Sequence, residues 1–511
     1  MTADLPIRLD YSVGRRDMGW IPRTILPQPS VFTRTVFLRS LGAVYCIAFA
    51  SASHQVDGLI GSQGILPIAP FLKAVGDAYS FRDRWEVLPT VFWINASDRS
   101  IHIVCFSGIG LSVLLMIGLL PTLVTALLWV LYLSIVTSGQ VFFGYQWDAL
   151  LLETGFLAIL YSPLQMMLWR RPSIPPNALI VLLLRLLLLR VMISSGIGKL
   201  SSDDPNWQHF RALDFHYFTQ PIPTWTAWYM QQLPPWFQTI SVGFTFFAEI
   251  IAPLMIFGPR ICRLIAFWTM NVLQLLIMVT GNFGFFNILT IALSIPLLDD
   301  RDWPVRWRQS FLPIYQRPRF PWVRWLMAPV AAVLGVLGAM KLVEGSYRPF
   351  DAPRPLSDVQ TAIAPFASVN SYGLFRVMTT TRNEIVVEGS DDGETWQAYE
   401  FRWKPGDVNR RPRFCTPDMP RLDWQMWFAS LGDVRSNPWF VNFLVQLLRG
   451  QKPVGALLEH NPFPDSPPGY VRALSYSYRF TTRDERRTSG AWWHRDLIGV
   501  YCPAISLRDI Q

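Results

Sequence analysis

Nine long apolar runs constrain the fold of this 511-residue chain more than any other feature of its sequence. A helix needs about 20 apolar residues to cross a bilayer. The runs lie near 31–53, 101–119, 122–143, 149–169, 177–199, 238–257, 262–280, 284–298 and 322–342. Only 16% of the residues are charged, whereas about a quarter are charged in soluble proteins. The sequence therefore predicts an α-helical polytopic membrane bundle of about nine spans.

Arginine residues are concentrated on one side of these predicted spans. They lie before the first span and in the loops between spans four and five, six and seven, and eight and nine: Arg8, Arg15, Arg16, Arg23, Arg170, Arg171, Arg260, Arg263, Arg301, Arg306, Arg308, Arg317, Arg319 and Arg324. Because cytoplasmic loops are enriched in Lys and Arg, we expect a cytoplasmic N-terminus and an extracytoplasmic C-terminal region. The formal net charge of +9 follows from this topology, so nucleic-acid binding is not predicted.

The spans and loops divide the chain into three expected parts. They are a cytoplasmic N-terminal segment 1–30, a transmembrane bundle 31–343 with outer loops 54–100 and 199–237, and a C-terminal extracytoplasmic domain 344–511. The membrane is expected to be that of the endoplasmic reticulum if the source is eukaryotic, and the plasma membrane if it is bacterial.

The C-terminal domain shows a different sequence pattern from the bundle. Residues 383–403 alternate apolar and polar side chains around Asp391-Asp392-Gly393, which is typical of a β-hairpin. Two amphipathic helices and two further strands are expected at 423–434, 438–459, 470–481 and 490–502. The pattern predicts a β-sandwich-like α+β domain. Its core is expected to contain Trp424, Trp427, Trp439 and Phe440.

The five cysteines give little information about function. Cys415 and Cys502 fall in the C-terminal domain, where they either form one disulfide in an oxidising compartment or remain buried thiols. The chain has no CxxC, HExxH or clustered His/Cys spacing. Neither a metal nor a cofactor is therefore predicted.

Asp148 and Glu153 are two carboxylates inside an otherwise apolar run. A charge at the centre of a membrane helix costs about 2.5–3.5 kcal/mol on insertion scales, so such residues face protein or water. We interpret both as partners of buried bundle arginines such as Arg185 or Arg190, because buried ion pairs are more often structural than chemical.

Lys199 lies at the outer end of the fifth predicted span, and three interpretations fit it. A snorkelling ammonium would pair with Asp203, with Asp204 or with lipid headgroups. A desolvated lysine could instead act as a base. The third interpretation is a contact to a client protein or to a membrane lipid.

The outer loop 199–237 is rich in aromatic side chains. They include Trp207, Phe210, Phe215, His216, Tyr217, Phe218, Trp225, Trp228, Tyr229 and Trp236. Such residues most often anchor a protein at the membrane interface. The functional alternative is an apolar surface that holds an unfolded or amphipathic client.

Several ordered segments resemble the lipase maturation factor family. They are 145–160, 195–207, 212–223, 386–393, 404–412, 420–428 and 461–463. The family's named eukaryotic member is an endoplasmic reticulum membrane protein needed for the folding and assembly of secreted, dimeric lipases. The resemblance implies a membrane-embedded maturation factor without turnover of its own, whose partner is a secreted or membrane-associated client, lipase-like by resemblance.

A more distant resemblance concerns the membrane bundle of vitamin K-dependent carboxylases. Residues 59–67 are similar to a loop of those enzymes, and Gly196-Ile-Gly-Lys-Leu200 is similar to a segment that carries their lysine base. It implies an alternative function, an enzyme acting on a peptide, lipid or quinone, with Lys199 as base and Glu153 or His216 assisting. A cavity of about 300 Å³ or more beside Lys199 would favour the enzyme. A transporter is a weaker third hypothesis.

We therefore predict one polar cluster with a structural or client-binding role. Its expected members are Asp148, Glu153, Lys199, Trp207, Asp214, His216, Trp228 and Trp236. In this hypothesis Asp148, Glu153, Lys199 and Asp214 fix the loop 199–237 on the bundle. Replacing Lys199 or Asp148 by alanine is then expected to abolish client maturation.

Overall fold

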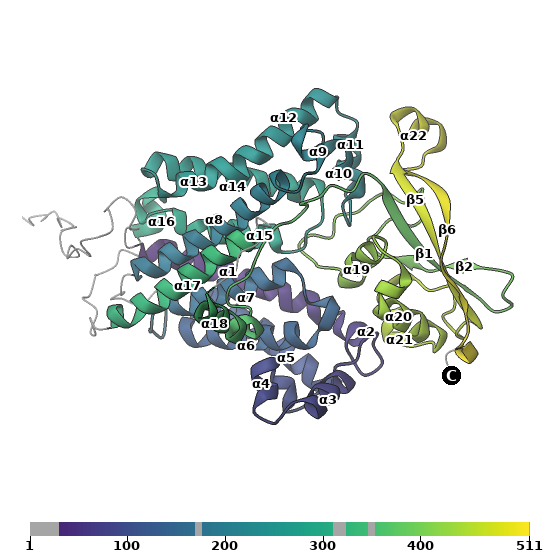
Figure 1. The fold of residues 1–511 in the computed structure, drawn as a ribbon, viewed down its shortest axis with the longest axis horizontal. Helices are drawn as coiled ribbons and strands as arrows, with labels where there is room; N and C mark the ends of the chain where they lie inside the picture. Colours follow the sequence, from purple (N-terminus) through teal and green to yellow (C-terminus); the bar gives the residue numbers. More distant parts are fainter. Residues whose placement is uncertain (1–29, 169–175, 310–322, 346–352, 510–511) are drawn as a thin grey trace, which may run out of the picture.

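A computed structural model describes residues 30–168, 176–309, 323–345 and 353–509. A helical bundle forms one end of the molecule and a twisted β-sheet forms the other (Figure 1). We call the end of the bundle that carries the C-terminal domain the docked end, and the opposite end, where the first helix begins at Val31, the distal end. The predicted N-terminal segment, except for Ser30, and Arg170, Arg171, Arg317 and Arg319 lie outside the described residues.

Seven helices are long and apolar enough to cross a membrane. They are α1 (Val31–Ser53), α5 (Asp98–Ile117), α6 (Pro121–Ser138), α8 (Ala178–Leu200), a continuous rod over Pro235–Phe257, α14 (Arg260–Thr280) and α17 (Val323–Gly345). The other two predicted spans are the shorter helices α7 (Gln146–Tyr161) and α15 (Phe286–Ser294). The prediction of a helical membrane bundle is thus confirmed, whereas the count of nine spans is not.

The turn between α5 and α6 shows how the sequence sets helix boundaries. Gly118 adopts a φ of 93°, which ends α5 with a left-handed residue. Pro121 then takes the first position of α6, where its missing N–H costs no hydrogen bond. The two helices are therefore adjacent and antiparallel after a three-residue connection.

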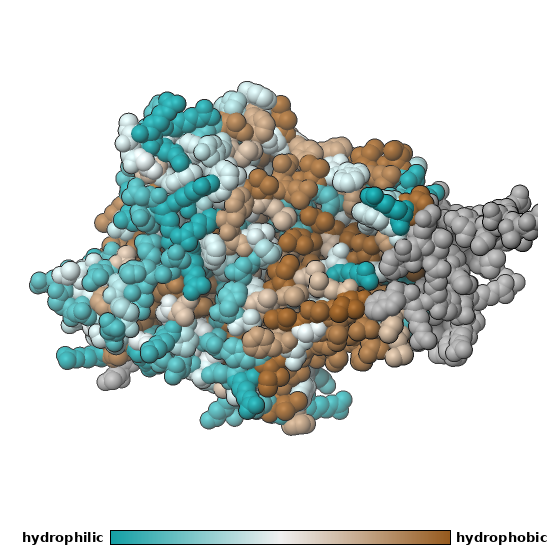
Figure 2. Space-filling view, turned by 180° about the vertical axis from the view of Figure 1, so that it is seen from behind, coloured by the Kyte–Doolittle hydropathy of each residue, from teal (hydrophilic) through white to brown (hydrophobic). Residues whose placement is uncertain are grey.

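The outer surface of the bundle is apolar. Figure 2 shows hydrophobic side chains gathered in a band over the bundle, next to the hydrophilic C-terminal domain. Large exposed apolar residues on three helices include Ile103, Phe106, Ile240, Leu254, Trp268 and Leu275. Exposure of so large an apolar surface to water is unfavourable, so the band is consistent with contact with membrane lipids.

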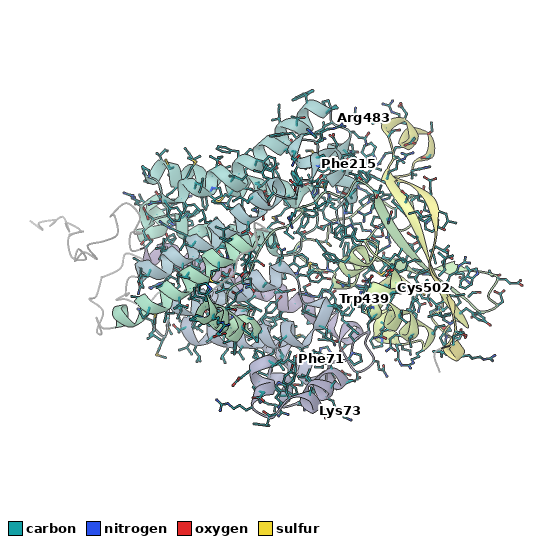
Figure 3. The ribbon with its side chains drawn as sticks, in the orientation of Figure 1. Phe71, Lys73, Phe215, Trp439, Arg483 and Cys502 are labelled. Carbon is teal, nitrogen blue, oxygen red and sulfur yellow. The ribbon has the colours of Figure 1, made fainter. Side chains whose placement is uncertain are left out.

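Short helices form the two outer loops at the docked end. Loop 54–100 contains α2 (Val56–Leu59), α3 (Ile68–Ala78) and α4 (Asp83–Val87). Loop 199–237 contains α9 (Pro205–Gln208), α10 (Leu213–Thr219) and α11 (Trp225–Gln231). Figure 3 labels Phe71 and Lys73 on α3, at the edge of the bundle, and Phe215 on α10, close to the sheet. At the distal end, α16 covers Val305–Gln309.

The C-terminal domain combines one four-stranded sheet with a layer of helices. Its strands are β1 (Arg382–Ser390), β2 (Gln397–Ala398), β3 (Glu400–Phe401), β4 (Leu458–His460), β5 (Tyr470–Phe480) and β6 (Trp493–Ile505). Its helices are α19 (Arg421–Ala429), α20 (Pro438–Leu448), α21 (Lys452–Gly455) and α22 (Arg483–Ser489), whereas α18 (Arg354–Ile363) lies beside the bundle (Figure 1). The antiparallel sheet has the order β2-β1-β5-β6, while β3 pairs with β4 separately.

The sheet differs from the predicted sandwich in one respect. The expected hairpin is present, but β2 pairs with β1 at only two positions before the chain leaves to form β3. Helices α19 and α20 pack against β1 and β5, where a second sheet was expected (Figure 1). An α+β domain is therefore shown, and the sandwich is not confirmed.

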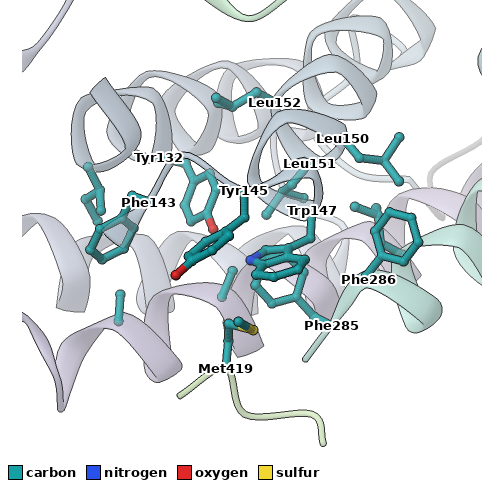
Figure 4. Packing of buried hydrophobic residues seen from close by; sticks show 14 of the residues in the cluster. Tyr132, Phe143, Tyr145, Trp147, Leu150, Leu151, Leu152, Phe285, Phe286 and Met419 are labelled. Carbon is teal, nitrogen blue, oxygen red and sulfur yellow. The ribbon is translucent and has the colours of Figure 1, made fainter. Parts of the chain in front are cut away.

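A continuous apolar core joins the C-terminal domain to the bundle. Figure 4 shows Met419 packed beneath Tyr145, Trp147 and Phe285 at the docked end. The predicted core residues Trp424, Trp439 and Phe440 are buried, while Trp427 is partly exposed. Figure 3 places Trp439 on α20 and Cys502 on β6. Both Cys415 and Cys502 are buried free thiols.

Candidate functional site

Asp148 and Arg421 form a fully buried ion pair between the bundle and the C-terminal domain. The Arg421 Nη1 and Nη2 atoms donate to the two carboxylate oxygens of Asp148 at 2.9 and 2.8 Å. The Tyr132 hydroxyl donates to the same carboxylate at 2.5 Å. Arg421 is the first residue of α19, so the predicted pairing of Asp148 with Arg185 or Arg190 is wrong.

Glu153 pairs with Arg190, as the sequence predicted, in a buried site between α7 and α8. Its other carboxylate oxygen accepts hydrogen bonds from the Asn370 backbone N–H at 2.9 Å and the Tyr372 hydroxyl at 2.8 Å. Arg185 instead donates to the Pro296 carbonyl at 3.1 Å. The segment after α18 thus contributes to the interior of the bundle.

Lys199 is buried and pairs with Glu249. Its Nζ atom donates to both carboxylate oxygens at 2.9 and 2.8 Å and lies 5.2 Å from the centre of the Trp207 ring. Asp204, a predicted partner, accepts hydrogen bonds from the Asn206 and Met378 backbone N–H groups instead. The snorkelling interpretation is therefore wrong, because the ammonium lies inside the protein, paired with Glu249 instead of with one of the predicted partners.

A π-helical turn over Phe247–Ile251 places Glu249 beside Lys199. Proline lacks a backbone N–H and its ring clashes with the carbonyl four residues before it. Pro253 stands four residues after Glu249, so it excludes the regular helical hydrogen bond at that position. On the facing helix, a Cβ atom at Gly196 would lie 2.5 Å from the Ile250 side chain and 3.1 Å from that of Glu249. Glycine there permits the close approach of α8 to the turn.

Trp207 and His216 lie beside this pair, as predicted for members of the cluster. The Trp207 indole donates to the Phe375 carbonyl at 3.0 Å. The His216 ring meets the Phe375 ring edge-on at 4.8 Å between centroids. Burial and the nearby Lys199 ammonium lower the pKa of His216 to about 4, so the imidazole is neutral at pH 7.

The remaining predicted residues lie apart from the ion pairs. Trp228 is buried and donates to the Thr481 carbonyl at 2.9 Å, which ties α11 to the sheet. Asp214 pairs at 3.0 Å with the exposed side chain of Arg211. Trp236 is 63% exposed. The eight residues therefore do not form one cluster, and the prediction that the Asp214 carboxylate fixes the loop on the bundle is wrong.

Both parts of the chain match described families. Residues 32–305 match the lipase maturation factor transmembrane domain, and residues 368–503 match the lipase maturation factor C-terminal domain. Lipase maturation factor 2 from Mus musculus is 36% identical over 594 aligned positions, which cover 93% of this chain and 83% of the relative. The chain belongs to the lipase maturation factor family.

Lipase maturation factor 1 is also similar to this family member. The Homo sapiens protein is 34% identical over 94% of this chain and 88% of its own length. The Bos taurus protein is 33% identical over 97% of this chain and 93% of its own length. No solved structure matches the chain. These relatives are named as maturation factors rather than enzymes, and the carboxylase alternative has no support.

Hydrogen-bond acceptors surround the Lys199 ammonium in this family member. A cavity of about 380 Å³ is bordered by Val408, Thr481 and Trp493 in the C-terminal domain, and Lys199 is not among its lining residues. The ammonium donates to two carboxylate oxygens and to the Ser195 carbonyl. All three protons of a protonated lysine are thereby engaged.

Sequence reasoning missed several residues that hold the C-terminal domain on the bundle. They are Ser51, Gln55, Asn282, Asn370, Tyr372, Arg382, Asp418 and Arg421. Asn282, for example, accepts hydrogen bonds from the Cys415 and Thr416 N–H groups and donates to the Arg413 carbonyl. The missed partner of Lys199, Glu249, did have a usable sequence signal, because it is the lone carboxylate in the apolar run 238–257.

Proposed function

We propose that this chain is a membrane-embedded folding and maturation factor for secreted or membrane-associated client proteins. The names of its relatives suggest lipases as the client class. The observation that carries the proposal is the match of both family domains over a single chain whose bundle and C-terminal domain share one core. The buried Asp148–Arg421 pair then holds the C-terminal domain in a fixed position for the client.

The proposed topology has nine crossings, a cytoplasmic N-terminus and an extracytoplasmic C-terminal domain from about residue 344. The contacts of α7 support its inclusion, because it begins where Tyr145 bonds to Gln425 and ends where Tyr161 packs on Phe37 near the start of α1. The helix therefore runs between the two ends of the bundle. The host membrane is proposed as the endoplasmic reticulum in a eukaryote or the plasma membrane in a bacterium.

Helix α15 supports the same topology. It follows Gly284, which lies against Met419 of the C-terminal domain at the docked end. The chain then reaches Asp300, whose carboxylate accepts hydrogen bonds from the first N–H groups of α1 at the distal end. Both short helices thus connect opposite ends, as a span does.

The proposed client surface is the outer edge of β6. Strand β6 is 13 residues long, stands last in the sheet order, and exposes 60% of Leu497 and 66% of Val500. A long edge strand with exposed apolar residues can accept another strand by backbone hydrogen bonding. We assign this edge to an extended apolar segment of an incompletely folded client. Exposed Trp236 and Tyr229 would contact membrane lipids or the client beside it.

Co-expression with a secreted lipase, in cells that lack their own lipase maturation factor, tests the proposal. The measurement is the specific activity of lipase released into the medium, with the amount of lipase protein determined separately. This chain is expected to restore activity, and Val500→Asp is expected to lower it several-fold without changing the amount of the chain. Val377→Asp, at a residue that is also exposed but lies outside the sheet, provides the matched control.

Two results would count against the proposal in different ways. No activity with the unchanged chain would contradict a maturation role toward this lipase class. Lipase activity could instead be normal with Val500→Asp and absent in cells that lack the chain. That result would support the maturation role and would show that the β6 edge is not the client surface.

A further inference from the structure

Arg411 and Arg486 of the C-terminal domain stack on a shared set of tryptophan rings. The guanidinium carbon of Arg486 lies 3.2 Å from the centre of the Trp492 ring and 4.8 Å from that of Trp228. The guanidinium carbon of Arg411 lies 5.8 Å from the Trp492 ring and 4.5 Å from that of Trp225. We call these five residues the arginine–tryptophan cluster. It joins α11 of the outer loop to the loop between β3 and α19 and to the segment from α22 to β6.

Neither arginine of this cluster forms an ion pair with another described residue. The side-chain contacts of Arg411 are those with the two rings. The Nη1 atom of Arg486 is buried and has no hydrogen-bond partner among the described residues. Burial lowers the pKa of Arg486, and although Tyr229 raises it, the positive charge of Arg411 lowers it as well. The cluster therefore holds two positive charges that repel each other.

The two acidic residues of α22 have other basic partners. Glu485 accepts hydrogen bonds from the Arg479 guanidinium at 2.7 Å, and Asp484 lies 3.8 Å from Arg487. Neither carboxylate is among the groups that shift the pKa of Arg486. The helix that carries Arg486 therefore does not supply the counter-charge, which leaves the cluster able to bind an anion.

The cluster lies where the exposed apolar face of α14 ends. The Thr224 hydroxyl, at the start of α11, donates to the Val279 carbonyl in the last turn of α14 at 3.2 Å. Val279 exposes 51% of its surface, and Leu275, one turn earlier on the same face, exposes 52%. Trp225 directly follows Thr224, so the cluster stands at the docked end of a lipid-facing helix (Figure 1). Headgroups rather than hydrocarbon chains occupy that level of a bilayer.

A small surface recess lies beside the cluster at the same level. Arg411 and Pro223 are among the residues that border it. The backbone of Pro223 pairs with that of Gly281, which directly follows α14. The Arg411 side chain is exposed, so a ligand can reach it from the membrane surface.

We propose that Arg411 and Arg486 bind the phosphate of a phospholipid headgroup at the docked end of the bundle. Guanidinium groups are weakly hydrated and match phosphate oxygens with two parallel hydrogen bonds. The tryptophan rings already hold both guanidinium groups by cation–π contacts, so less side-chain freedom is lost when the phosphate binds. The acyl chains of the same lipid lie along Leu275 and Val279. This inference is independent of the client.

Purified, delipidated full-length protein in an uncharged detergent tests the site. The melting temperature is measured with increasing amounts of phosphatidylglycerol, of diacylglycerol, which lacks the phosphate, or of inorganic phosphate. Phosphatidylglycerol is expected to raise the melting temperature of the unchanged protein at the lowest concentration, and diacylglycerol to have little effect. The Arg411→Gln/Arg486→Gln variant is expected to need about tenfold to a hundredfold more phosphatidylglycerol, the effect of losing charge-assisted hydrogen bonds.

Arg413→Gln/Arg487→Gln is the matched control, because it removes two exposed arginines from the same loop and the same helix. It is expected to respond to phosphatidylglycerol as the unchanged protein does. Arg411→Gln alone changes an exposed residue and should still need about tenfold more lipid. A normal response of this single variant would overturn the proposal, even if the double variant failed to fold.

The other additives separate the possible ligands. Equal stabilisation by diacylglycerol would overturn the phosphate site, because the acyl chains alone would then explain the effect. Equal stabilisation by inorganic phosphate would overturn the lipid as the source and assign the site to a soluble phosphate compound. Stronger stabilisation by a polyglutamate peptide would reassign the cluster to an acidic protein segment.

Discussion

The two ends of the bundle differ in where the partners of their buried charges come from. At the docked end, Asp148, Glu153 and Lys199 each have a partner of opposite charge within the protein. At the distal end, Asp299 pairs with Arg263 and Arg301, which are both residues of the bundle. The docked end therefore needs Arg421 of the C-terminal domain to complete its ion pairs, whereas the pairs of Asp299 are formed within the bundle.

Removing Arg421 should produce the largest change in this comparison. Arg421→Ala leaves Asp148 buried and unpaired, which is expected to cost about 3–5 kcal/mol of stability. The readout is the melting temperature in detergent, together with the rate at which a protease separates the C-terminal domain. Arg413→Ala, which removes a half-exposed pair with Glu459, should cost at most about 1 kcal/mol. Equal effects of the two variants would contradict a special role for the docked-end pair.

The Lys199–Glu249 pair should show a similar but recoverable loss. Lys199→Ala leaves Glu249 without its partner and is expected to lower stability by about 3 kcal/mol and to reduce client maturation. The double variant Lys199→Met/Glu249→Leu removes both charges, so stability should return to nearly the original value. If its stability returns but lipase activity does not, Lys199 has a function beyond holding the structure.

The neutral state of His216 predicts a pH dependence confined to the docked end. Its folded pKa of about 4 lies below the ordinary value of 6.5, so the unfolded chain binds the proton more readily between these values. Stability is therefore complete above about pH 6.5 and falls as the pH is lowered toward 4. The shift corresponds to at most about 3 kcal/mol, reduced by the partial exposure of the ring.

Unfolding curves recorded from pH 7 to pH 4 measure this effect. The variant His216→Gln should lose most of the decrease, because it removes the group that takes up the proton. An unchanged decrease in the variant would assign the pH dependence to another residue.

The smallest effect is expected at Asp214. Asp214→Ala removes a surface pair with Arg211 and should change stability by less than about 1 kcal/mol, because exposed ion pairs contribute little. The melting temperature and client maturation should both stay close to the original values. A loss as large as that of Lys199→Ala would restore the sequence-based hypothesis that Asp214 fixes the outer loop.

The helices of the bundle could be predicted because a membrane helix satisfies its own backbone hydrogen bonds and must be apolar outside. The run 177–199 became α8, Ala178–Leu200, with a shift of one residue. The run 149–169 was less accurate, since α7 begins at Gln146 and ends at Tyr161. The first turn of α7 contains the polar residues Gln146 and Asp148, so the apolar run begins later than the helix does.

The ion pairs were predictable only where both partners lie in apolar runs. Glu153 and Arg190 meet this condition, and their pairing was predicted correctly. Arg421 lies in a polar domain, where nothing in its neighbourhood distinguishes it from other arginines. The sequence predicted Lys199 at the membrane surface. It is buried instead beneath Trp207, which is held by the segment around Phe375, and that segment is distant in sequence.

The pair between Asp148 and Arg421 has a consequence for how the chain is made. The two residues are 273 positions apart, and synthesis proceeds at about 5–20 residues per second, so Arg421 is made roughly 14 to 55 seconds after Asp148. Until then, the Tyr132 hydroxyl is the partner of the Asp148 carboxylate that has already been synthesised. A protein proposed to assist the maturation of other proteins thus completes its own bundle only after its C-terminal domain has been synthesised.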